Sequence, residues 1–392
     1  MASVLIAIVA AVMAVKKGKA SPTNGDIRQC VDLEIPVKVA IESQILAQPR
    51  VDNNIDAVDW ASTMTTWSKP DPSFLGNITI KETFKINGRL CVPTIKGARS
   101  DILQLATHGV GFDKRYWDSE IKPKQYSYVE AALAQGYSIF TYDRLGVGLS
   151  SKPDAYDIVQ TDVQLEILRQ LTLLARSGKL ISSSKKLGGS RNLDRYTPSN
   201  IIHVGHSYGS ILSVGLLSTN GSLSDGAILT GFLYTNKLDQ ANVATWGFEF
   251  ARESDRKRFG DRGSGYIVQA TKSNVQISFF KKGGFEPAML DYAEEIKQPN
   301  TITEFSTLAS ALGKVAVDFK GPVQFIIGEF DYGFCAGDCK GTYDIEGIKK
   351  LYPAAKDVGV HIQPGTGHGL ALSLNATAGY KVSFDFLHKS GL

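Results

Sequence analysis

The chain has 392 residues, of which 43% are hydrophobic and 21% charged, a composition typical of a soluble globular protein with a sizeable core. Its 43 basic and 39 acidic residues give a formal net charge of +4 and are spread along the sequence. Because there is no long basic run and no interleaving of basic with aromatic residues, the charge pattern argues against nucleic acid as a partner.

The first twenty residues contain an unbroken apolar run, Val4 to Val15, that is too short to cross a bilayer as a helix. Its length is typical of a signal-peptide core, and small residues up to Ala20 offer cleavage sites, although the lysines follow the run instead of preceding it. We therefore predict a signal peptide at 1–20 and one domain at 21–392. A membrane-anchored or frayed N-terminus is the alternative. No later segment reaches the ~18 apolar residues of a spanning helix.

Sequons and cysteines agree with export to an oxidising compartment. Sequons, which also occur by chance, predict glycosylation at Asn77, Asn220 and Asn375. The four cysteines lack the paired spacing of a zinc site. Of the three possible pairings we expect Cys30 with Cys91 and Cys335 with Cys339, the second closing a short loop.

The alternating pattern of 77–92, together with 31–40, predicts antiparallel strands that open a sheet. Short apolar runs then alternate with helical stretches, which predicts a parallel sheet with helical crossovers. The predicted strands are 102–106, 138–142, 200–204, 227–233, 323–327 and 360–363, and the predicted helices are 126–135, 158–175 and 211–217.

Two segments interrupt this alternation. The stretch 177–199 is rich in Ser, Lys and Gly and is interpreted as a surface excursion. The interval 236–320 is too long for one crossover and is rich in aromatic residues, which predicts an inserted helical lid. The alternative is that these aromatics only pack the small core of the insertion.

Gly205-His206-Ser207-Tyr208-Gly209 matches the G-x-S-x-G pattern, and it follows a predicted strand and precedes a predicted helix. A serine on such a turn projects its hydroxyl above the carboxyl edge of the sheet, and the flanking glycines let the backbone pass closely. The following helix offers its N-terminal N–H groups to a developing oxyanion. Ser207 is therefore the candidate nucleophile.

A serine hydroxyl needs a histidine base and a group that orients the base. Among the six histidines, His368 lies in a glycine-rich loop directly after the last predicted strand, where this topology delivers an imidazole to the serine. His203 and His206 are sequence neighbours of Ser207, whereas a base must approach from another segment. We predict structural or surface roles for the remaining histidines, His203, His206, His361 and His388 among them.

Asp331 follows the predicted strand 323–327 and is the candidate acid, in the order serine, acid, histidine. Asp239, after the preceding strand, is the main rival. Glu329 lies closer to the strand end, and Asp338 lies further out beside the cysteines. The alternative role for Asp331 is capping of a turn.

His108-Gly109-Val110-Gly111 follows the strand 102–106 and places a flexible backbone beside the nucleophile turn. The N–H groups of Val110 and Tyr208 are the candidate oxyanion hole, at about 3 kcal/mol per donor. His108 is expected to shape the loop.

These motifs resemble those of fungal-type secreted α/β-hydrolases of the AB hydrolase-1 family, which include serine esterases and lipases. The resemblance covers about Cys30 to Leu392 and includes the stretch YDRLGVGLS at 142–150, similar to a D-x-x-G-x-G-x-S segment whose glycines shape a turn near the site. It implies the α/β-hydrolase fold, a mostly parallel central sheet flanked by helices with a helical lid. The segment 177–199 departs from the family pattern.

The nucleophile narrows the reaction, because dehalogenases and epoxide hydrolases of that family use aspartate there. Serine favours cleavage of an ester, thioester or lactone through an acyl-enzyme. We expect no cofactor and no metal, a moderately apolar small-molecule ester or lactone as substrate, and no membrane span in the mature protein. The alternatives are an acyltransferase or lyase of secondary metabolism, and a non-catalytic binding protein of the same fold.

Overall fold

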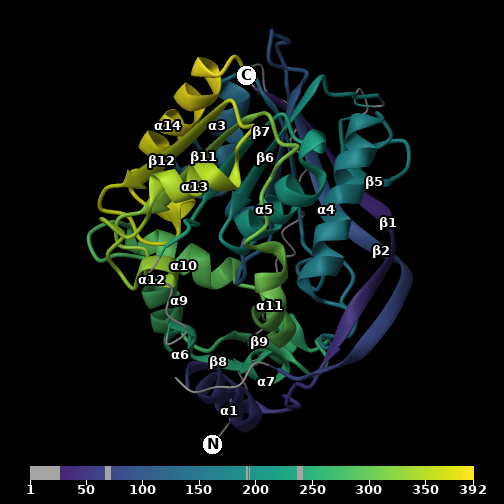
Figure 1. Cartoon of the computed structure of the whole chain (residues 1–392), viewed down its shortest axis with the longest axis vertical. Helices are drawn as coiled ribbons and strands as arrows, with labels where there is room; N and C mark the ends of the chain where they lie inside the picture. The colour runs from purple at the N-terminus through teal and green to yellow at the C-terminus, as the bar shows by residue number, and fades with distance from the viewer. Residues whose placement is uncertain (1–26, 67–71, 191–192, 194, 236–241) are drawn as a thin grey trace, which may run out of the picture.

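The computed structural model describes residues 27–66, 72–190, 193, 195–235 and 242–392, so the predicted signal peptide lies outside the described residues. Its centre is a nine-stranded sheet with helices on both faces (Figure 1). In spatial order the strands are β12 (Asp357–Gln363), β11 (Pro322–Gly328), β7 (Gly226–Thr230), β6 (Asn200–His206), β3 (Ile102–Thr107), β4 (Ser138–Tyr142), β2 (Phe74–Pro93), β1 (Arg28–Leu46) and β5 (Lys185–Gly189).

The strands from β12 to β4 pair in parallel, so their carboxyl ends meet at one edge of the sheet. The strands β2, β1 and β5 extend the sheet by antiparallel pairing. This arrangement confirms the predicted mostly parallel sheet with antiparallel opening strands. Along β1, buried residues alternate with more exposed ones, and Val31, Leu33 and Ile35 are fully buried.

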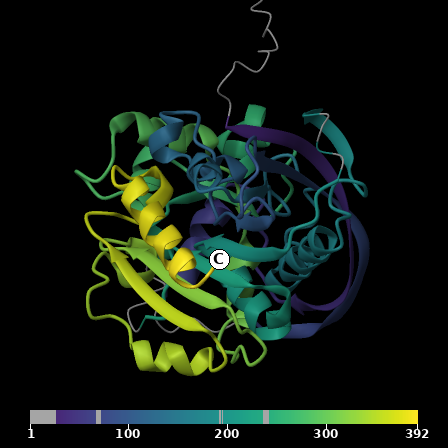
Figure 2. The ribbon, with the colours of Figure 1, turned by 90° about the horizontal axis from the view of Figure 1, so that it is seen from above.

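Helices cover both faces of the sheet, and Figure 2 shows α14 (Ala376–Lys389) and α13 (Ile345–Leu351) on opposite sides of the strands. The helices α3 (Tyr128–Ala134) and α14 (Ala376–Lys389) pack together, as do α4 (Thr161–Arg176) and α5 (Tyr208–Asn220). The other short helices here are α2 (Pro123–Tyr126), α12 (Tyr332–Cys335) and α13 (Ile345–Leu351). The predicted helix 126–135 is divided at Ser127, whose side chain accepts a hydrogen bond from the N–H of Glu130 and caps α3.

The interval 242–311 forms a group of short elements at one end of the molecule (Figure 1). It contains a three-stranded sheet in the order β10, β9, β8. Helix α1 (Asn54–Thr65), which the sequence did not predict, packs against this group at β8. The elements are α6 (Asn242–Thr245), β8 (Phe248–Phe250), α7 (Ala251–Ser254), α8 (Arg256–Phe259), β9 (Tyr266–Gln269), α9 (Lys272–Phe279), α10 (Pro287–Ile296), β10 (Asn300–Thr301) and α11 (Ile302–Thr307).

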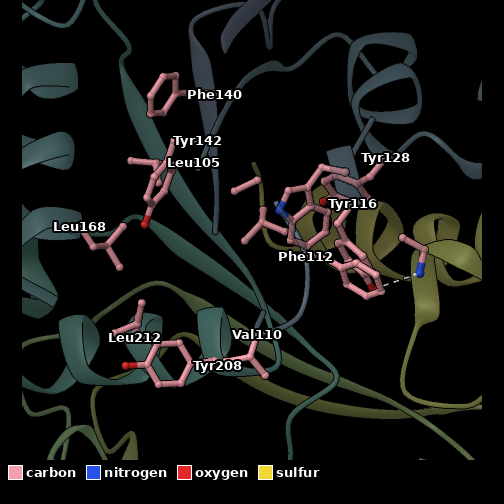
Figure 3. Close-up of a cluster of buried hydrophobic side chains, with 14 of the residues drawn as sticks. Leu105, Val110, Phe112, Tyr116, Tyr128, Phe140, Tyr142, Leu168, Tyr208 and Leu212 are labelled. Carbon is pink, nitrogen blue, oxygen red and sulfur yellow. Dashed lines mark hydrogen bonds between the residues drawn. The ribbon is translucent and has the colours of Figure 1, made fainter. Parts of the chain in front are cut away.

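The stretch 177–199 is more than a surface excursion, because residues 185–189 form β5 and pair with β1 at the sheet edge. A smaller cluster of buried hydrophobic side chains lies at β7, β11 and α5, and a larger cluster contains side chains of β1, β2, β3, β4 and β6. Figure 3 shows part of the larger cluster, with Leu105 of β3, Phe140 and Tyr142 of β4 and Leu168 of α4 among the buried side chains. Within the described ranges, no helix combines the length and the apolar character needed to cross a membrane.

Candidate active site

Ser207 stands at the turn between β6 and α5, with φ of 53° and ψ of −119°. A non-glycine residue rarely adopts such a conformation, and it persists only where the surroundings enforce it. Here the N–H of Ser207 donates to the carbonyl of Thr230 on β7 at 2.8 Å. A Cβ at Gly205 would lie 2.4 Å from the Cα of Ser210, and one at Gly209 would lie 2.1 Å from the carbonyl oxygen of Thr107. Both glycines are therefore needed for the close passage of the backbone.

His368 and Asp331 lie side by side at the carboxyl edge of the sheet, after β12 and β11. The Nδ1 of His368 is 2.6 Å from Oδ2 of Asp331, and both side chains are buried. Because an ionised carboxylate only accepts, Nδ1 carries the proton and Nε2 carries the lone pair. Nε2 has no hydrogen-bond partner within the described residues. Asp331 also caps α12, since its Oδ1 accepts from the N–H of Phe334 at 3.0 Å.

The imidazole of His368 is held among rings close to the nucleophile turn. Its ring centroid is 4.9 Å from that of His206, the residue before Ser207. The rings of Phe279 and Phe334 stack on His368 at 5.7 and 5.8 Å. These contacts orient the imidazole beside the serine turn.

Gly231 makes room for the two neighbouring imidazoles and explains why β7 ends at Thr230, earlier than predicted. Its φ is +56°, and a Cβ there would lie 2.6 Å from Cε1 of His206 and 3.2 Å from Cε1 of His368. A side chain at this position would displace His206, crowd His368 and strain the backbone.

The loop after β3 approaches Ser207 directly, because a Cβ at Gly109 would lie 2.8 Å from the Cβ of Ser207. Val110 is buried, and no described residue provides an acceptor for its N–H or for that of Tyr208. His108 shapes this loop: its Nδ1 donates to the carbonyl of Gly109 at 2.8 Å, and its Nε2 accepts from the N–H of Arg144 at 3.0 Å. Burial, aided by the charge of Arg144, holds the pKa of His108 well below its usual value.

The other histidines have local structural contacts. His203 lies between Thr172 and Ser224, at 3.0 and 2.8 Å, and burial lowers its pKa to about 3. His206 bonds to Thr230 at 3.1 Å, and burial, followed by the neighbouring His368, lowers its pKa. His361 bonds to Gln363, and His388 stacks on Tyr137.

Two of the alternative acids, Glu329 and Asp338, have partners other than His368. Glu329 forms an ion pair with Lys340 and accepts from the N–H of Gly365 at 2.8 Å. Asp338 accepts from the N–H of Lys340 at 3.1 Å. Neither has a contact with His368 among the interactions of the described residues. Asp239 lies outside the described residues.

A buried cation beneath the site was missed by the sequence analysis, although Arg144 belongs to the DRLGVG stretch. Arg144 forms an ion pair with Glu304 of α11, and both side chains are 1% exposed. Its Nη2 donates to the carbonyl of Gly109 at 3.3 Å, and its guanidinium lies 4.7 Å from the ring centroid of Tyr208. Gln164 bonds to both members of the pair. Arg144 thus connects the 242–311 group to both loops around Ser207, a long-range contact without a local sequence signal.

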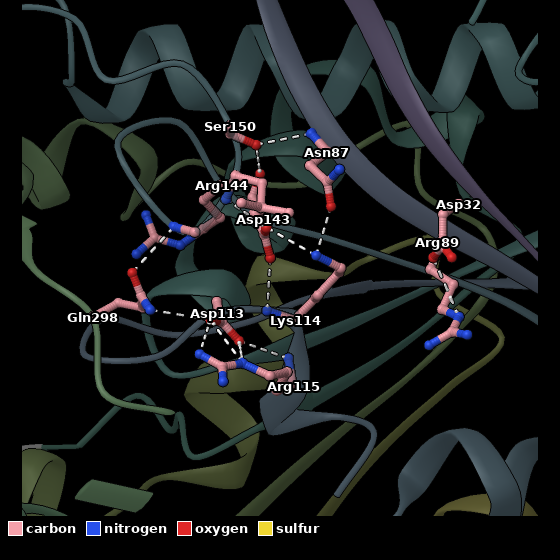
Figure 4. Close-up of polar contacts among 12 residues, drawn as sticks. Asp32, Asn87, Arg89, Asp113, Lys114, Arg115, Asp143, Arg144, Ser150 and Gln298 are labelled. Atoms are coloured by element: carbon pink, nitrogen blue, oxygen red, sulfur yellow. Dashed lines mark hydrogen bonds and ion pairs between the residues drawn. The ribbon is translucent and has the colours of Figure 1, made fainter. Parts of the chain in front are cut away.

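A second connection joins the same group to the loop after β3, residues 108–113, which is the candidate oxyanion loop (Figure 4). The N–H of Gln298 donates to the carbonyl of Gly111 at 2.8 Å, and its side chain donates to Asp113 at 3.2 Å. Beside it, Lys114 forms an ion pair with the buried Asp143 at 2.9 Å. Burial is the main cause of the raised pKa of Asp143, and Lys114 opposes it.

The cysteines form two disulfides, Cys30 with Cys91 and Cys335 with Cys339. The first joins paired positions on β1 and β2. Asn77 of the first sequon is exposed, and Asn220 is half-buried at the end of α5.

Asn375, of the third sequon, has both amide atoms engaged. Its Nδ2 donates to the carbonyl of Pro364 at 2.6 Å, and its Oδ1 accepts from Thr366 at 2.7 Å. These bonds brace the turn that precedes His368. Among the residues that the structure describes, no three His, Cys, Asp or Glu side chains gather as ligands for a metal ion.

Comparison with known proteins adds a family match. A profile of the alpha/beta hydrolase family matches residues 105–378, which is more than half of the chain. A search of curated protein sequences finds no match.

Solved structures with a similar backbone include a thermophilic esterase from Thermogutta terrifontis in a malate-bound form, at 15% identity and a TM-score of 0.48, covering 88% of this chain and 99% of that one. They also include a bromoperoxidase from Bacillus anthracis, at 17% identity and a TM-score of 0.47, covering 78% and 96%. A third is the alpha/beta hydrolase GrgF from Penicillium sp. sh18, at 14% identity and a TM-score of 0.47, covering 79% and 95%.

Proposed function

Because the chain belongs to the alpha/beta hydrolase family, we propose that it is a serine hydrolase that cleaves a carboxylic ester or lactone of a moderately apolar small molecule. Ser207 is the nucleophile, His368 the base and Asp331 the group that orients the base. The observation that carries the proposal is the 2.6 Å contact of His368 with Asp331, which leaves Nε2 of His368 as a free base beside the serine turn.

In the first half of the reaction, Nε2 of His368 takes the hydroxyl proton while Oγ of Ser207 attacks the carbonyl carbon. The imidazolium then gives this proton to the departing alcohol, and an acyl-enzyme remains. In the second half, His368 takes a proton from water, which attacks the acyl carbon, and returns it to Ser207 as the acid leaves. Asp331 stabilises the imidazolium in both halves.

The oxyanion formed in each half is bound by the N–H groups of Val110 and Tyr208. Tyr208 is the first residue of the 13-residue helix α5, whose N-terminal dipole favours negative charge at this point. Such donors are effective because they already point toward the place where charge develops.

We also propose that the predicted lid, 236–320, covers this edge of the sheet through its described part, 242–320. Phe279 of α9 stacks on His368, and Glu304 of α11 pairs with Arg144, so the described part of the interval reaches the site from two sides. The aromatic side chains here favour an apolar substrate.

Export of the chain is a further part of the proposal, supported by its two disulfides. Expression of the full sequence in a eukaryotic host, with the culture medium and cells assayed separately, tests it. Full-length protein found only inside the cells would contradict export.

Hydrolysis of p-nitrophenyl esters tests the reaction. We expect turnover of short-chain esters, and a fall of roughly 10³-fold or more in kcat for Asp331→Asn, as for loss of the orienting carboxylate in other triads. Asp239→Asn is the matched control and should retain activity. A large loss in Asp239→Asn with activity retained in Asp331→Asn would overturn the assignment of the acid.

A further inference from the structure

Gln269, at the end of β9, has a buried carboxamide beside the oxyanion loop. Its side chain is fully buried, and neither Oε1 nor Nε2 has a hydrogen-bond partner within the described structure. A Cβ at Gly111 would lie 3.2 Å from this Oε1 and 3.4 Å from this Nε2. The amide end therefore faces Gly111, next to the Val110 N–H that we assign to the oxyanion hole.

The immediate surroundings of this amide are aromatic. Phe279 also touches the Gly111 position, at 3.2 Å, and stacks on His368. The ring centroid of Trp246 lies 5.6 Å from that of Phe279 and 5.8 Å from that of Phe248, the residue paired with Gln269 across the sheet. A continuous series of rings thus leads from the catalytic imidazole past Gln269.

Asn300 adds a second carboxamide of the same kind. It is 1% exposed, and both of its amide atoms are without a partner in the described structure. Asn300 pairs with Ile267 of β9, and Gln269 is two positions further along that strand. In a sheet, side chains of paired residues point to the same face, and so do those two positions apart on one strand. Asn300 and Gln269 therefore project from the same face of the small sheet.

Two unpaired buried carboxamides are costly in the free protein, since each buried polar atom lacks the bond it would have in water. A ligand that offers both a donor and an acceptor recovers those bonds. A flat apolar ligand without them leaves the amides unpaired, so the site discriminates strongly against it.

We propose that Gln269 and Asn300 recognise the substrate, and that the substrate is an aromatic or similarly flat ester or lactone carrying an adjacent donor and acceptor, as in a carboxamide or lactam. This inference rests on the proposed function for its reaction. Gln269, beside the oxyanion loop, is the primary determinant of specificity, and Asn300 extends the same recognition surface.

Matched ester pairs test the inference. One pair is 4-carbamoylphenyl acetate and 4-isopropenylphenyl acetate, and the other carries the same two groups on the acyl side, in 4-nitrophenyl 3-phenylpropanoates. For at least one pair, we expect Gln269→Met to lower the kcat/KM ratio of carbamoyl to isopropenyl ester by about tenfold or more, the effect of two hydrogen bonds. Asn300→Leu should lower the same ratio. Intrinsic ester reactivity cancels in this comparison.

Gln324→Met is the control, because Gln324 is also buried and has an unpaired Oε1, but lies on β11 of the central sheet. Its selectivity ratio should equal that of the unmodified chain. Gln269→Met should have a melting temperature no lower than that of the unmodified chain, because no bond within the protein is lost and an unpaired buried amide is removed. An unchanged ratio, or loss of folding in this variant, would overturn the inference.

Binding of benzamide separates this inference from the proposed reaction. Millimolar benzamide should raise the melting temperature of the unmodified chain and have a smaller effect on Gln269→Met. If the chain fails to react with a fluorophosphonate but benzamide binding depends on Gln269, the reaction is wrong and the recognition stands. If the fluorophosphonate labels the chain, but Gln269→Met changes neither benzamide binding nor the selectivity ratio of the ester pairs, the recognition is wrong and the reaction stands.

Discussion

The pair of Arg144 and Glu304 is predicted to be strongly coupled in stability. Both side chains are 1% exposed, so replacement of one partner leaves an uncompensated buried charge. We expect Arg144→Met and Glu304→Gln each to lower the free energy of unfolding by about 3–5 kcal/mol. The double variant removes both charges and keeps an amide that bonds to Gln164, so its loss should fall about 3 kcal/mol short of the sum of the single losses.

Urea denaturation of the unmodified chain, the two single variants and the double variant measures this coupling energy. The comparison requires that the four proteins have equal denaturant slopes. Arg169→Met is the matched control, because the Arg169–Glu166 pair, at 2.7 Å, has its arginine 32% exposed and should contribute at most about 1 kcal/mol. Losses that add within about 0.5 kcal/mol would refute the reasoning.

Arg144→Met should also reduce catalysis by more than its effect on folding explains. Arg144 bonds to the Gly109 carbonyl and stacks on Tyr208, so its loss frees both backbone segments that we assign to the oxyanion hole. We expect kcat to fall with little change in KM, at a temperature where the variant is fully folded, because the oxyanion exists only in the transition state. A rise in KM alone would contradict this role.

Three other predictions concern single features. Gly109→Ala should lower kcat by roughly 10²-fold, because its methyl group would lie 2.8 Å from the Cβ of Ser207. Gly97→Ala, with no atom within 4 Å, should leave kcat unchanged, and equal activities of the two variants would contradict this. His203, with its pKa lowered to about 3 by burial, stays neutral while the unfolded chain gains a proton below about pH 6.5. Stability should therefore fall with decreasing pH, and His203→Gln should reduce the slope of unfolding free energy by about 1.4 kcal/mol per pH unit between pH 6 and 4; an unchanged slope would exclude the linkage. Replacing Cys30 and Cys91 by serine should cost about 4 kcal/mol in urea denaturation, from a sequence separation of 61 residues, and a loss below about 1 kcal/mol would show that the bond does not constrain the unfolded chain.

Strands buried on both faces were the most predictable part of the fold. The strand 138–142 was predicted with the bounds of β4, and all five of its residues are buried. The predicted α/β-hydrolase fold was confirmed as well. β5 was missed because its five residues are exposed and it pairs with β1 through backbone bonds, which leave no hydrophobic pattern.

The candidate site likewise has a part that could be predicted from the sequence and a part that could not. Ser207 and His368 each follow a predictable strand, so the sequence could indicate the sheet edge at which they meet. Arg144, Gln269 and Asn300 have roles that depend on segments distant in sequence, such as the approach of β9 to Gly111, and no local pattern marks such contacts.

Covalent labelling at Ser207 tests the central claim most directly. The unmodified chain, treated with a fluorophosphonate, should gain one adduct by intact mass, and peptide mapping should locate it on Ser207. Ser207→Ala, shown to be folded by its melting temperature, should gain none. A folded unmodified chain without an adduct, or an adduct that persists in Ser207→Ala, would contradict the assignment of Ser207 as the nucleophile.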